Sequence, residues 1–425
     1  MQVDELADLG PTRRSALFDR DSGLDEIASD VEAIIERVRE TGDQAVRGYS
    51  EEFDEVSVGQ LSVTGDLERA VEEIDDEVRE AIEIAAENIR TFHERQRPDE
   101  WTIETKGSEL GRRYRPVERV GAYVPGGTAT YPSSALMTII PAKVAGVDQV
   151  AVTTPPGDPV HPVTLAACSI AGADEVYRVG GVQAIAALAY GTESIHAVDR
   201  IVGPGNRWVA AAKRSIQRDV PIDLVAGPSE ILIIADETAE PKYLAADLLA
   251  QAEHDPRSPC VLVTDDAEIA ADTLAILEET IATIPREETA RTALEQPASG
   301  VFLARSLSEA ISFADTFAPE HLLITTADDD AIVSRIEHAA SIFLGSYSPV
   351  AAGDYASGPN HVLPTGGLAR VTGGLSVDDF LRSTTVQRLD RAHLGELEPT
   401  ITTLARAEGL EAHARSVEVR TESDE

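Results

Sequence analysis

The chain has few of the residues on which several classes of protein depend. It contains two cysteines in 425 residues, Cys168 and Cys260, so it cannot form a disulfide framework and offers no C-x-x-C metal site. Both lie in apolar stretches, where buried free thiols are expected. No apolar run approaches the roughly 20 residues of a membrane-spanning helix. The N-terminus, MQVDELADLG, lacks the basic and apolar regions of a signal peptide. These absences predict a cytoplasmic protein that does not enter a membrane.

Lysine is also scarce, while acidic residues are abundant along the whole chain. The sequence has 75 Asp and Glu against 36 Lys and Arg, which gives a formal net charge of −39. Such a surface repels phosphate backbones, so nucleic-acid binding is disfavoured. Its self-repulsion destabilises the fold in dilute buffer, and salt screens that repulsion. We therefore expect a halophilic protein, adapted to a salt-rich cytoplasm.

What the chain does contain, from Val117 onward, is an alternation of short β-branched segments with helical patterns. Strands are expected at Val120–Val124, Gln149–Thr153, Glu175–Val179, Arg200–Val202 and Ile231–Ala235, and in a second set at Cys260–Thr264, Val301–Ala304, His321–Ile324 and Ser341–Leu344. Helices are expected at Ser133–Ala145, Pro162–Ala171, Val182–Tyr190, Arg207–Gln217 and Pro241 to about Asp255. This alternation predicts an α/β fold with two Rossmann-like parallel-sheet domains and helical N- and C-terminal segments.

The expected domain boundaries follow from the same pattern. Residues 1–20 form an arm, 21–122 with 231–375 the first domain, 123–230 the second domain, and 376–425 a C-terminal helical segment. Helical periodicity also covers 24–53 and the stretch from Leu67 to about Arg95. The last strand signal lies near Leu344, and His93 is expected as a solvated residue at a helix end.

Three glycine-rich turns follow successive expected strands: VPGG (124–127), VGG (179–181) and VGPGN (202–206). Each leaves backbone N–H groups near a helix start, an arrangement that suits a dinucleotide phosphate. None is a G-x-G-x-x-G, and tight turns need glycine in any case. Tyr123, Gln183 and Asn206 lie beside these turns. They could bind a cofactor or simply stabilise the turns.

Two polar pairs lie further along. Gln251 and His254 are three apart at the end of an expected helix, so they share a face and could reach one ion. Glu320 and His321 open an expected strand after Pro319 and form a plausible acid/base couple. Strand neighbours point to opposite faces, so a strand edge or loop is needed for both to line one pocket. A polar helix end and an exposed strand start remain the alternative interpretations.

The long Gly/Pro-rich segment Ala351–Gly367 adds Asp354 and His361, and long loops are more often functional than decorative. Near the C-terminus, AEGLEAHARSV places Glu408 and His413 five residues apart. The remaining isolated histidines are expected at the surface or in caps: His161, His196, His338 and His393.

Together these motifs resemble the histidinol dehydrogenase family, zinc enzymes of the last steps of histidine biosynthesis. The matching segments, in the family's order, are GAYVPGG, RVGGVQAIAALAYGTES, VGPGN, AGPSEILIIAD, AQAEHD, APEHLL, SIFLGSYSPVAAGDYASGPNHVLPT and the closing AH. They cover about Val117 to His413. The resemblance implies a four-electron oxidation of an amino alcohol, L-histidinol, to L-histidine through L-histidinaldehyde, with two NAD.

The resemblance also implies roles for single residues. Zinc, one ion per subunit, would be held by Gln251, His254, Asp354 and His413, a set without thiolate that suits a metal binding substrate. His321 would take the alcohol proton and Glu320 would activate water. Ser229 and Glu408 would contact substrate together with the zinc ligands and His321, and Tyr123, Gln183 and Asn206 would contact NAD. His361 is secondary. The family forms homodimers in which the C-terminal segment crosses to the partner. The resemblance therefore implies that Glu408 and His413 complete the other subunit's active site.

Three other functions are compatible with parts of the pattern. A relative on the same scaffold could oxidise another alcohol, such as a sulfonated diol, and Ser229 and Glu408 would distinguish it. A zinc-stabilised NAD-binding module would bind both cofactors without turnover, which the Glu320–His321 pair argues against. A zinc hydrolase needs no dinucleotide, so this function would not explain the three glycine-rich turns.

Overall fold

The computed structural model describes residues 2–20, 23–105, 107–126 and 130–422. Gly127, the last residue of the VPGG turn, lies outside these ranges. The chain divides into two compact units, each described here by itself. Unit 1 comprises Met1–Gln96 and Val117–Phe380, and unit 2 comprises Arg97–Pro116 and Leu381–Glu425. The domain boundaries expected from the sequence stay a prediction.

Within the described ranges, unit 1 holds two parallel sheets. The first, called sheet A, has the order β1-β10-β9-β8-β11-β12, and the second, sheet B, the order β6-β5-β4-β7. Sheet A is built from β1 (Val3–Glu5), β8 (Ile231–Ala235), β9 (Cys260–Thr264), β10 (Gly300–Leu303), β11 (His321–Thr325) and β12 (Ser341–Leu344). Sheet B is built from β4 (Arg119–Tyr123), β5 (Gln149–Thr154), β6 (Glu175–Arg178) and β7 (Arg200–Val202). The α/β fold class with two parallel sheets is therefore confirmed. The nine expected strands have bounds within a residue of those observed, whereas β1 was not expected.

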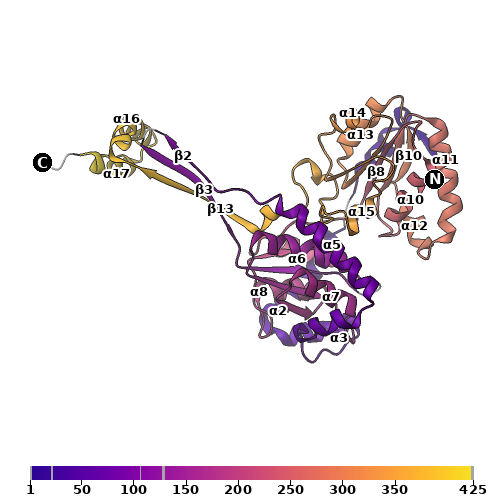
Figure 1. Ribbon diagram of the computed structural model, residues 1–425, viewed down its shortest axis with the longest axis horizontal. Helices are drawn as coiled ribbons and strands as arrows, with labels where there is room; N and C mark the ends of the chain where they lie inside the picture. The colour runs from indigo at the N-terminus through magenta and orange to yellow at the C-terminus, as the bar shows by residue number, and fades with distance from the viewer. Residues whose placement is uncertain (1, 21–22, 106, 127–129, 423–425) are drawn as a thin grey trace. The chain divides into compact units, whose positions relative to one another are not determined.

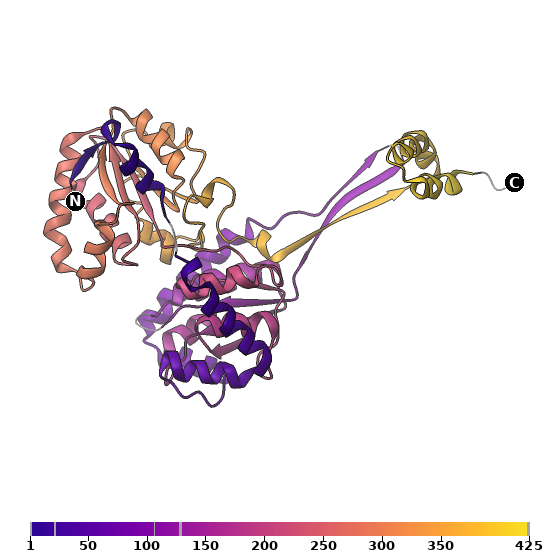
Figure 2. The same cartoon turned by 180° about the vertical axis from the view of Figure 1, so that it is seen from behind.

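Strand β8 shows why sheet A forms. All five of its residues are buried, as expected for a central parallel strand covered on both faces. Ile231 and Ile233 pack in a core with Leu248, and the alternating Leu232 and Ile234 pack in a second core with Phe317. The helices of these layers are α1 (Pro11–Phe18), α10 (Pro241–Ala252), α11 (Ala267–Thr280), α12 (Glu287–Leu294), α13 (Leu307–Phe317), α14 (Asp329–Val333) and α15 (Val350–Tyr355). Figure 1 shows α13 and α14 on one side of this sheet and α10, α11 and α12 on the other. The N-terminal strand β1 pairs with β10, as seen from behind in Figure 2.

Sheet B is covered by helices from its own crossovers and from the N-terminal segment. They are α2 (Ala28–Thr41), α3 (Asp43–Asp54), α4 (Leu67–Glu73), α5 (Asp76–Glu94), α6 (Pro132–Ala145), α7 (Pro162–Ala171), α8 (Gly181–Tyr190) and α9 (Arg207–Ile216). The two long N-terminal helical patterns are each divided in two. Gly42, with φ 53°, separates α2 from α3, and the extended Ile74 separates α4 from α5.

The expectation for His93 is wrong. Its side chain is fully buried, with Nδ1 2.8 Å from the carbonyl oxygen of Ile89 and Nε2 3.4 Å from Nδ2 of Asn360. Asn360 Nδ2 also donates to the carbonyl oxygen of Met137 at 2.7 Å. His93 therefore lies in an internal polar network that holds the segment preceding His361.

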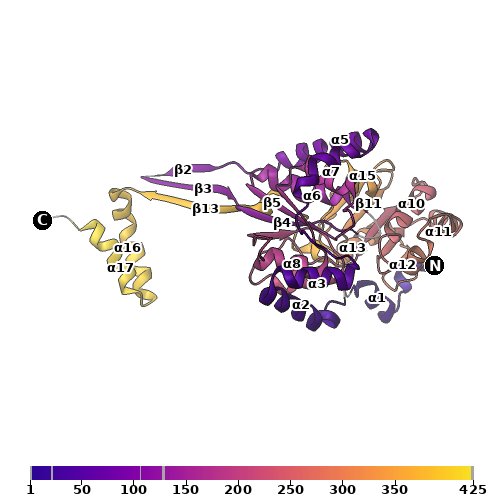
Figure 3. The same cartoon turned by 90° about the horizontal axis from the view of Figure 1, so that it is seen from below.

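Unit 2 consists of an antiparallel sheet, β13-β3-β2, and two helices. Its elements are β2 (Trp101–Thr105), β3 (Ser108–Pro116), β13 (Leu381–Leu389), α16 (Arg391–Ala407) and α17 (Glu411–Thr421), and the strands run alongside one another in Figure 3. The expectation that strands end near Leu344 is wrong, because β13 lies beyond it. Strand β13 is mostly solvent-exposed and therefore carries no apolar alternation that would reveal it in the sequence. Among the described residues of unit 2, no large side chain is buried.

Within the described residues, no helix is both long and apolar enough to cross a lipid bilayer.

Candidate functional site

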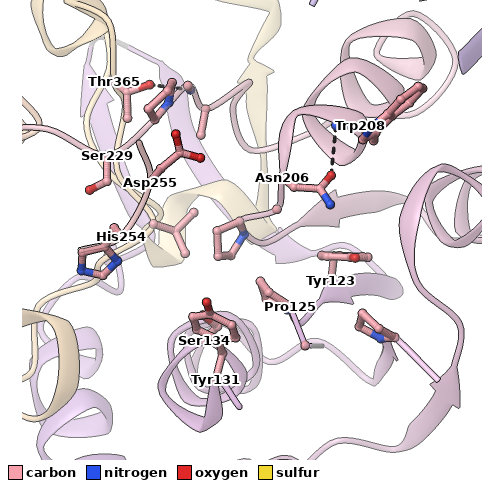
Figure 4. Close-up of a pocket in the computed structure, with 18 of the residues that line it drawn as sticks. Tyr123, Pro125, Tyr131, Ser134, Asn206, Trp208, Ser229, His254, Asp255 and Thr365 are labelled. Atoms are coloured by element: carbon pink, nitrogen blue, oxygen red, sulfur yellow. Dashed lines mark hydrogen bonds between the residues drawn. The ribbon is translucent and has the colours of Figure 1, made fainter. Parts of the chain in front are cut away.

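A cavity of about 850 Å³ in unit 1 gathers most of the residues that the sequence singled out. Its walls come from the carboxyl ends of strands in sheet B and from the amino ends of β8 and β11 in sheet A. The singled-out residues that line it are Tyr123, Gln183, Asn206, Ser229, His254, Glu320, His321, Asp354 and His361. Figure 4 shows Ser229 and His254 on one side of this cavity and Tyr123 and Asn206 on the other.

Glu320 and His321 both reach this cavity because Glu320 precedes the first residue of β11. Helix α13 ends at Phe317, and the left-handed φ of 51° at the following Ala318 turns the chain into Pro319. The alternation of strand side chains therefore does not yet apply at Glu320. Both side chains are buried, and His321 Nδ1 lies 3.6 Å from Glu320 Oε2. The pair thus faces one space, as its proposed acid/base role requires.

The Glu320 carboxylate is held from the amino end of β8. Its Oε2 accepts hydrogen bonds from Ser229 Oγ at 2.6 Å and from the backbone N–H of Glu230 at 2.8 Å. Burial raises the pKa of Glu320 to about 8, the two hydrogen bonds oppose this rise, and the charge of Asp354 adds to it. A carboxyl group with its pKa close to neutrality can exchange protons with water at physiological pH.

His321 is prepared as a base. Its Nδ1 lies 3.1 Å from the carbonyl oxygen of Glu230, while Nε2 is buried and has no hydrogen-bond partner. That Nε2 lies 3.8 Å from Oδ1 of Asp354. Burial lowers the pKa of His321, against the pull of the Asp354 charge, so the imidazole is neutral at physiological pH.

Three of the four expected zinc ligands lie in unit 1. Gln251 is in the last turn of α10, and His254 follows two residues beyond the helix, its backbone N–H bonded to the carbonyl oxygen of Gln251 at 3.2 Å. Asp354 is in α15. Protein atoms crowd His254 on most sides and lower its pKa, yet its ring still lies open to the cavity.

The donor set fits a metal in its chemistry. The side-chain amide nitrogen of Gln251 is buried with no partner, so this nitrogen has no hydrogen bond to lose if the amide turns its oxygen to an ion. The described residues contain no group of three or more His, Cys, Asp or Glu placed to hold a metal. The expected set brings only His254 and Asp354 of those types from unit 1. Glu408, which follows α16, and His413, in the first turn of α17, belong to unit 2 and are exposed.

On the sheet B side, the three expected cofactor residues lie next to the glycine-rich turns: Tyr123 ends β4, Gln183 lies in the first turn of α8, and Asn206 precedes α9. The Tyr123 hydroxyl accepts a hydrogen bond from the backbone N–H of Gly181 at 3.2 Å. Asn206 caps α9, its Oδ1 accepting from the N–H groups of Trp208 at 3.0 Å and Val209 at 3.2 Å. Gln183 differs, because its Oε1 is buried and has no partner. Turn stabilisation therefore accounts for the first two side chains but not for Gln183.

His361, which the sequence indicated only as a secondary site residue, lines the cavity and contacts Asp354 and Ser134. Its Nδ1 lies 2.9 Å from the carbonyl oxygen of Asp354, and its Nε2 lies 3.3 Å from Ser134 Oγ. Burial lowers its pKa. Two further residues beside the cavity were missed entirely, Glu230 and Arg20. Glu230 stands next to Ser229 in the GPSE segment, where its charge was the available signal, whereas Arg20 lies 210 positions away in sequence.

The remaining histidines outside the cavity agree with their expected roles in part. His161 caps α7, accepting from Val163 N–H, and His196 is exposed. His338 and His393 are partly buried.

Comparison with known proteins is consistent along the whole chain. The family model described as histidinol dehydrogenase matches residues 19–421. A histidinol dehydrogenase of Haloarcula marismortui is 60% identical over 422 residues, which are 99% of this chain and 100% of the relative. One from Halobacterium salinarum is 59% identical over 425 residues, 100% of both chains. The crystal structure of histidinol dehydrogenase from Elizabethkingia anophelis superposes with a TM-score of 0.93 at 37% identity, covering 99% of this chain and 98% of that one.

A family match over nearly the full length, together with the buried Glu320–His321 pair at the cavity, gives one conclusion: this chain belongs to the histidinol dehydrogenase family of oxidoreductases.

Proposed function

We propose that this protein oxidises L-histidinol to L-histidine through L-histidinaldehyde, the last steps of histidine biosynthesis, with two NAD⁺ and one Zn²⁺ per subunit. The observation that carries the proposal is the buried Glu320–His321 pair, which opens onto the same cavity as Ser229, His254 and Asp354. The names of the relatives supply the substrate.

In the first oxidation, His321 Nε2 accepts the hydroxyl proton of the alcohol while a hydride leaves its carbon. The neutral ring has this nitrogen free, since Nδ1 is directed at the carbonyl oxygen of Glu230. NAD held along the Tyr123, Gln183 and Asn206 wall would supply the hydride acceptor in both oxidations.

In the second oxidation, Glu320 removes a proton from the water that adds to the aldehyde. A second hydride then leaves the hydrate while His321, having passed its first proton to solvent, accepts the hydroxyl proton of the hydrate. Hydrogen bonds from Ser229 Oγ and from the Glu230 N–H hold Oε2 of Glu320 in place, so the other carboxyl oxygen is left to accept a proton from water. Burial of this pair keeps the reactive aldehyde away from bulk solvent.

Zinc held by Gln251, His254, Asp354 and His413 would orient the substrate through its imidazole and amino groups. Glu408 suits the cationic amino alcohol by charge. Ser229 is expected to contact substrate too, although its hydroxyl also donates to Glu320.

We further propose a cytoplasmic homodimer in which His413 and Glu408 complete the partner's site. Support comes from unit 2, whose described residues bury no large side chain while Trp101, Ile103, Leu404 and Val419 are exposed. A segment so poor in core needs another surface to pack against.

Two assays test the proposal. NADH formation from histidinol is compared with that from a sulfonated diol. If only the diol is oxidised, the protein is the related dehydrogenase and not a histidinol dehydrogenase. If NAD and zinc bind without any turnover, the protein is a binding module.

Shared active sites are tested by unfolding the inactive His321→Asn and His413→Ala proteins, mixing them and refolding them together. Recovery of up to about a quarter of wild-type activity is expected from one intact site per mixed dimer, and recovery of none would contradict subunit sharing.

A further inference from the structure

A buried ion pair lies behind the Glu320–His321 pair and outside the roles assigned above. Arg20 Nη1 donates to both oxygens of Glu230 at 2.8 Å. The side chain of Arg20 is 8% exposed and that of Glu230 is 1% exposed. A bidentate pair removed from water in this way is expensive to form, so its geometry must be supported on all sides.

Arg20 is also fixed to the segment that leads into Glu320. Its Nη2 donates to the carbonyl oxygen of Phe317 at 2.6 Å, and its guanidinium lies over the Phe317 ring, 4.1 Å from the centroid. Gly367 leaves the room for it, since a Cβ there would come within 2.9 Å of Nη2. Only Nε of the guanidinium is buried without a partner.

Glu230 in turn is bonded to Glu320 and His321 from both its side chain and its backbone. Its Oε1 accepts from the backbone N–H of Glu320 at 3.3 Å, and its own N–H donates to Glu320 Oε2 at 2.8 Å. Its carbonyl oxygen accepts from the backbone N–H of His321 at 3.2 Å and faces His321 Nδ1 at 3.1 Å.

We infer that Arg20 and Glu230 are positioning residues, a buried couple that fixes the carboxylate of Glu320 against the imidazole of His321. Neither side chain lines the cavity, so neither touches substrate. Arg20 acts through Glu230 and through the Phe317 carbonyl, at the two segments that carry the reacting groups. The effect falls mainly on Glu320, because Glu230 holds His321 by its backbone alone. This inference rests on the proposed function for its kinetic consequence.

The matched control is Arg13. It too lies in the N-terminal segment, bonds backbone carbonyls, those of Pro297 and Ser299, and stacks over a phenylalanine, Phe302, at 5.7 Å from the centroid. It contacts neither β8 nor the start of β11. Arg20→Gln should lower the unfolding midpoint more than Arg13→Gln, because it leaves Glu230 buried without its partner. The two variants should also differ in catalysis.

The kinetic test compares Arg20→Gln, Glu230→Gln, their double variant and Arg13→Gln with the wild type in high salt. We expect kcat of Arg20→Gln to fall about ten- to a hundredfold, with KM for histidinol and NAD changed less than about threefold. NADH formed per histidine should rise above the wild-type value of two, because aldehyde escapes when hydration is slow. The double variant should be no slower than the slower single variant. An equal loss in Arg13→Gln, an unchanged NADH ratio or additive effects would overturn the inference.

A second measurement does not depend on turnover. Hydrogen exchange at the backbone amide of Glu320 should accelerate at least about tenfold in Arg20→Gln and remain at the wild-type rate in Arg13→Gln. Unchanged exchange in Arg20→Gln would contradict the positioning role even if the wild type failed to oxidise histidinol. Failure of the wild type with histidinol, by contrast, would refute the proposed function alone.

Discussion

The Nδ1 atom of His321 lies 3.1 Å from the backbone carbonyl oxygen of Glu230. A carbonyl oxygen can only accept a hydrogen bond, so Nδ1 carries the proton and Nε2 is left as the basic nitrogen. A backbone group thus selects the tautomer, and no side-chain substitution at position 230 can remove it.

Replacing His321 by Asn removes the basic nitrogen with a small change in volume. We expect the rate of histidinol oxidation to fall by about 10² to 10⁴, the range of general base catalysis. The unfolding midpoint should change little, because Nε2 of the wild-type ring makes no hydrogen bond and the Asn amide can donate to the Glu230 carbonyl oxygen in place of Nδ1. Steady-state kinetics and thermal unfolding of the same preparation check both statements, and an active variant would contradict the assigned base.

The buried Glu320 should make stability depend on pH. Its pKa rises from 4.5 to about 8 on folding, so its contribution to stability is fully present below pH 4.5 and is lost as pH rises toward 8. Glu320→Gln should therefore flatten the fall in unfolding free energy between pH 5 and 8 by at least about 1 kcal/mol. Denaturant unfolding of metal-free protein in high salt measures this. Parallel curves for variant and wild type would show that Glu320 titrates normally.

Removing the amide of Gln251 should weaken metal binding without loosening α10. Gln251→Ala deletes a proposed ligand whose amide nitrogen has no partner in the protein. We expect zinc affinity to fall at least about tenfold in competition with a chelator. Glu240→Gln, an exposed residue at the opposite end of α10, is the control and should retain wild-type zinc. Equal zinc content in all three proteins would remove Gln251 from the ligand set.

Gln183 offers a separate test on the cofactor side. Its Oε1 is buried and unpaired, so Gln183→Ala should cost the free protein nothing in hydrogen bonding. Loss of the hydrogen bond between Gln183 and NAD should raise the KM for NAD about three- to tenfold, while the KM for histidinol stays constant. Fluorescence titration with NAD gives the dissociation constant directly. Unchanged NAD affinity would mean that Gln183 serves the fold and not the cofactor.

The net charge of −39 predicts stabilisation by salt. The unfolding midpoint should rise by several °C between low and molar KCl, since the Debye length falls to about 3 Å at 1 M. Sucrose at equal osmolality is the control, and a rise equal to that in KCl would show that solute exclusion, and not screening, is responsible.

The sequence was informative where burial creates a pattern. The run Ile231–Ala235 and its counterparts were located to within a residue because a strand covered on both faces must be apolar throughout. Strands β1, β2, β3 and β13 were missed. The residues of β2 and β13 are mostly exposed and obey no such constraint. His93 was misread because its polarity suggested solvent, while its partners, Ile89 and Asn360, lie one turn back and far along the chain.

The candidate site divides in the same way. The Glu320–His321 pair was visible as neighbours, but its shared orientation depends on Ala318 and Pro319, which place Glu320 just ahead of the strand. The Arg20–Glu230 pair could not be found, because nothing near Arg20 in sequence indicates that its partner is 210 residues away. A functional pair that is adjacent in sequence can be recognised from the sequence, whereas an ion pair formed only by the tertiary fold cannot.

Sheet A meets the cavity with the amino ends of β8 and β11, so the turns after Ala235, Thr264, Leu303 and Thr325 leave the sheet at its opposite edge. None of the site residues named above lies in those turns. They are therefore natural places for a protein engineer to insert a tag, a label or a fused domain without disturbing turnover.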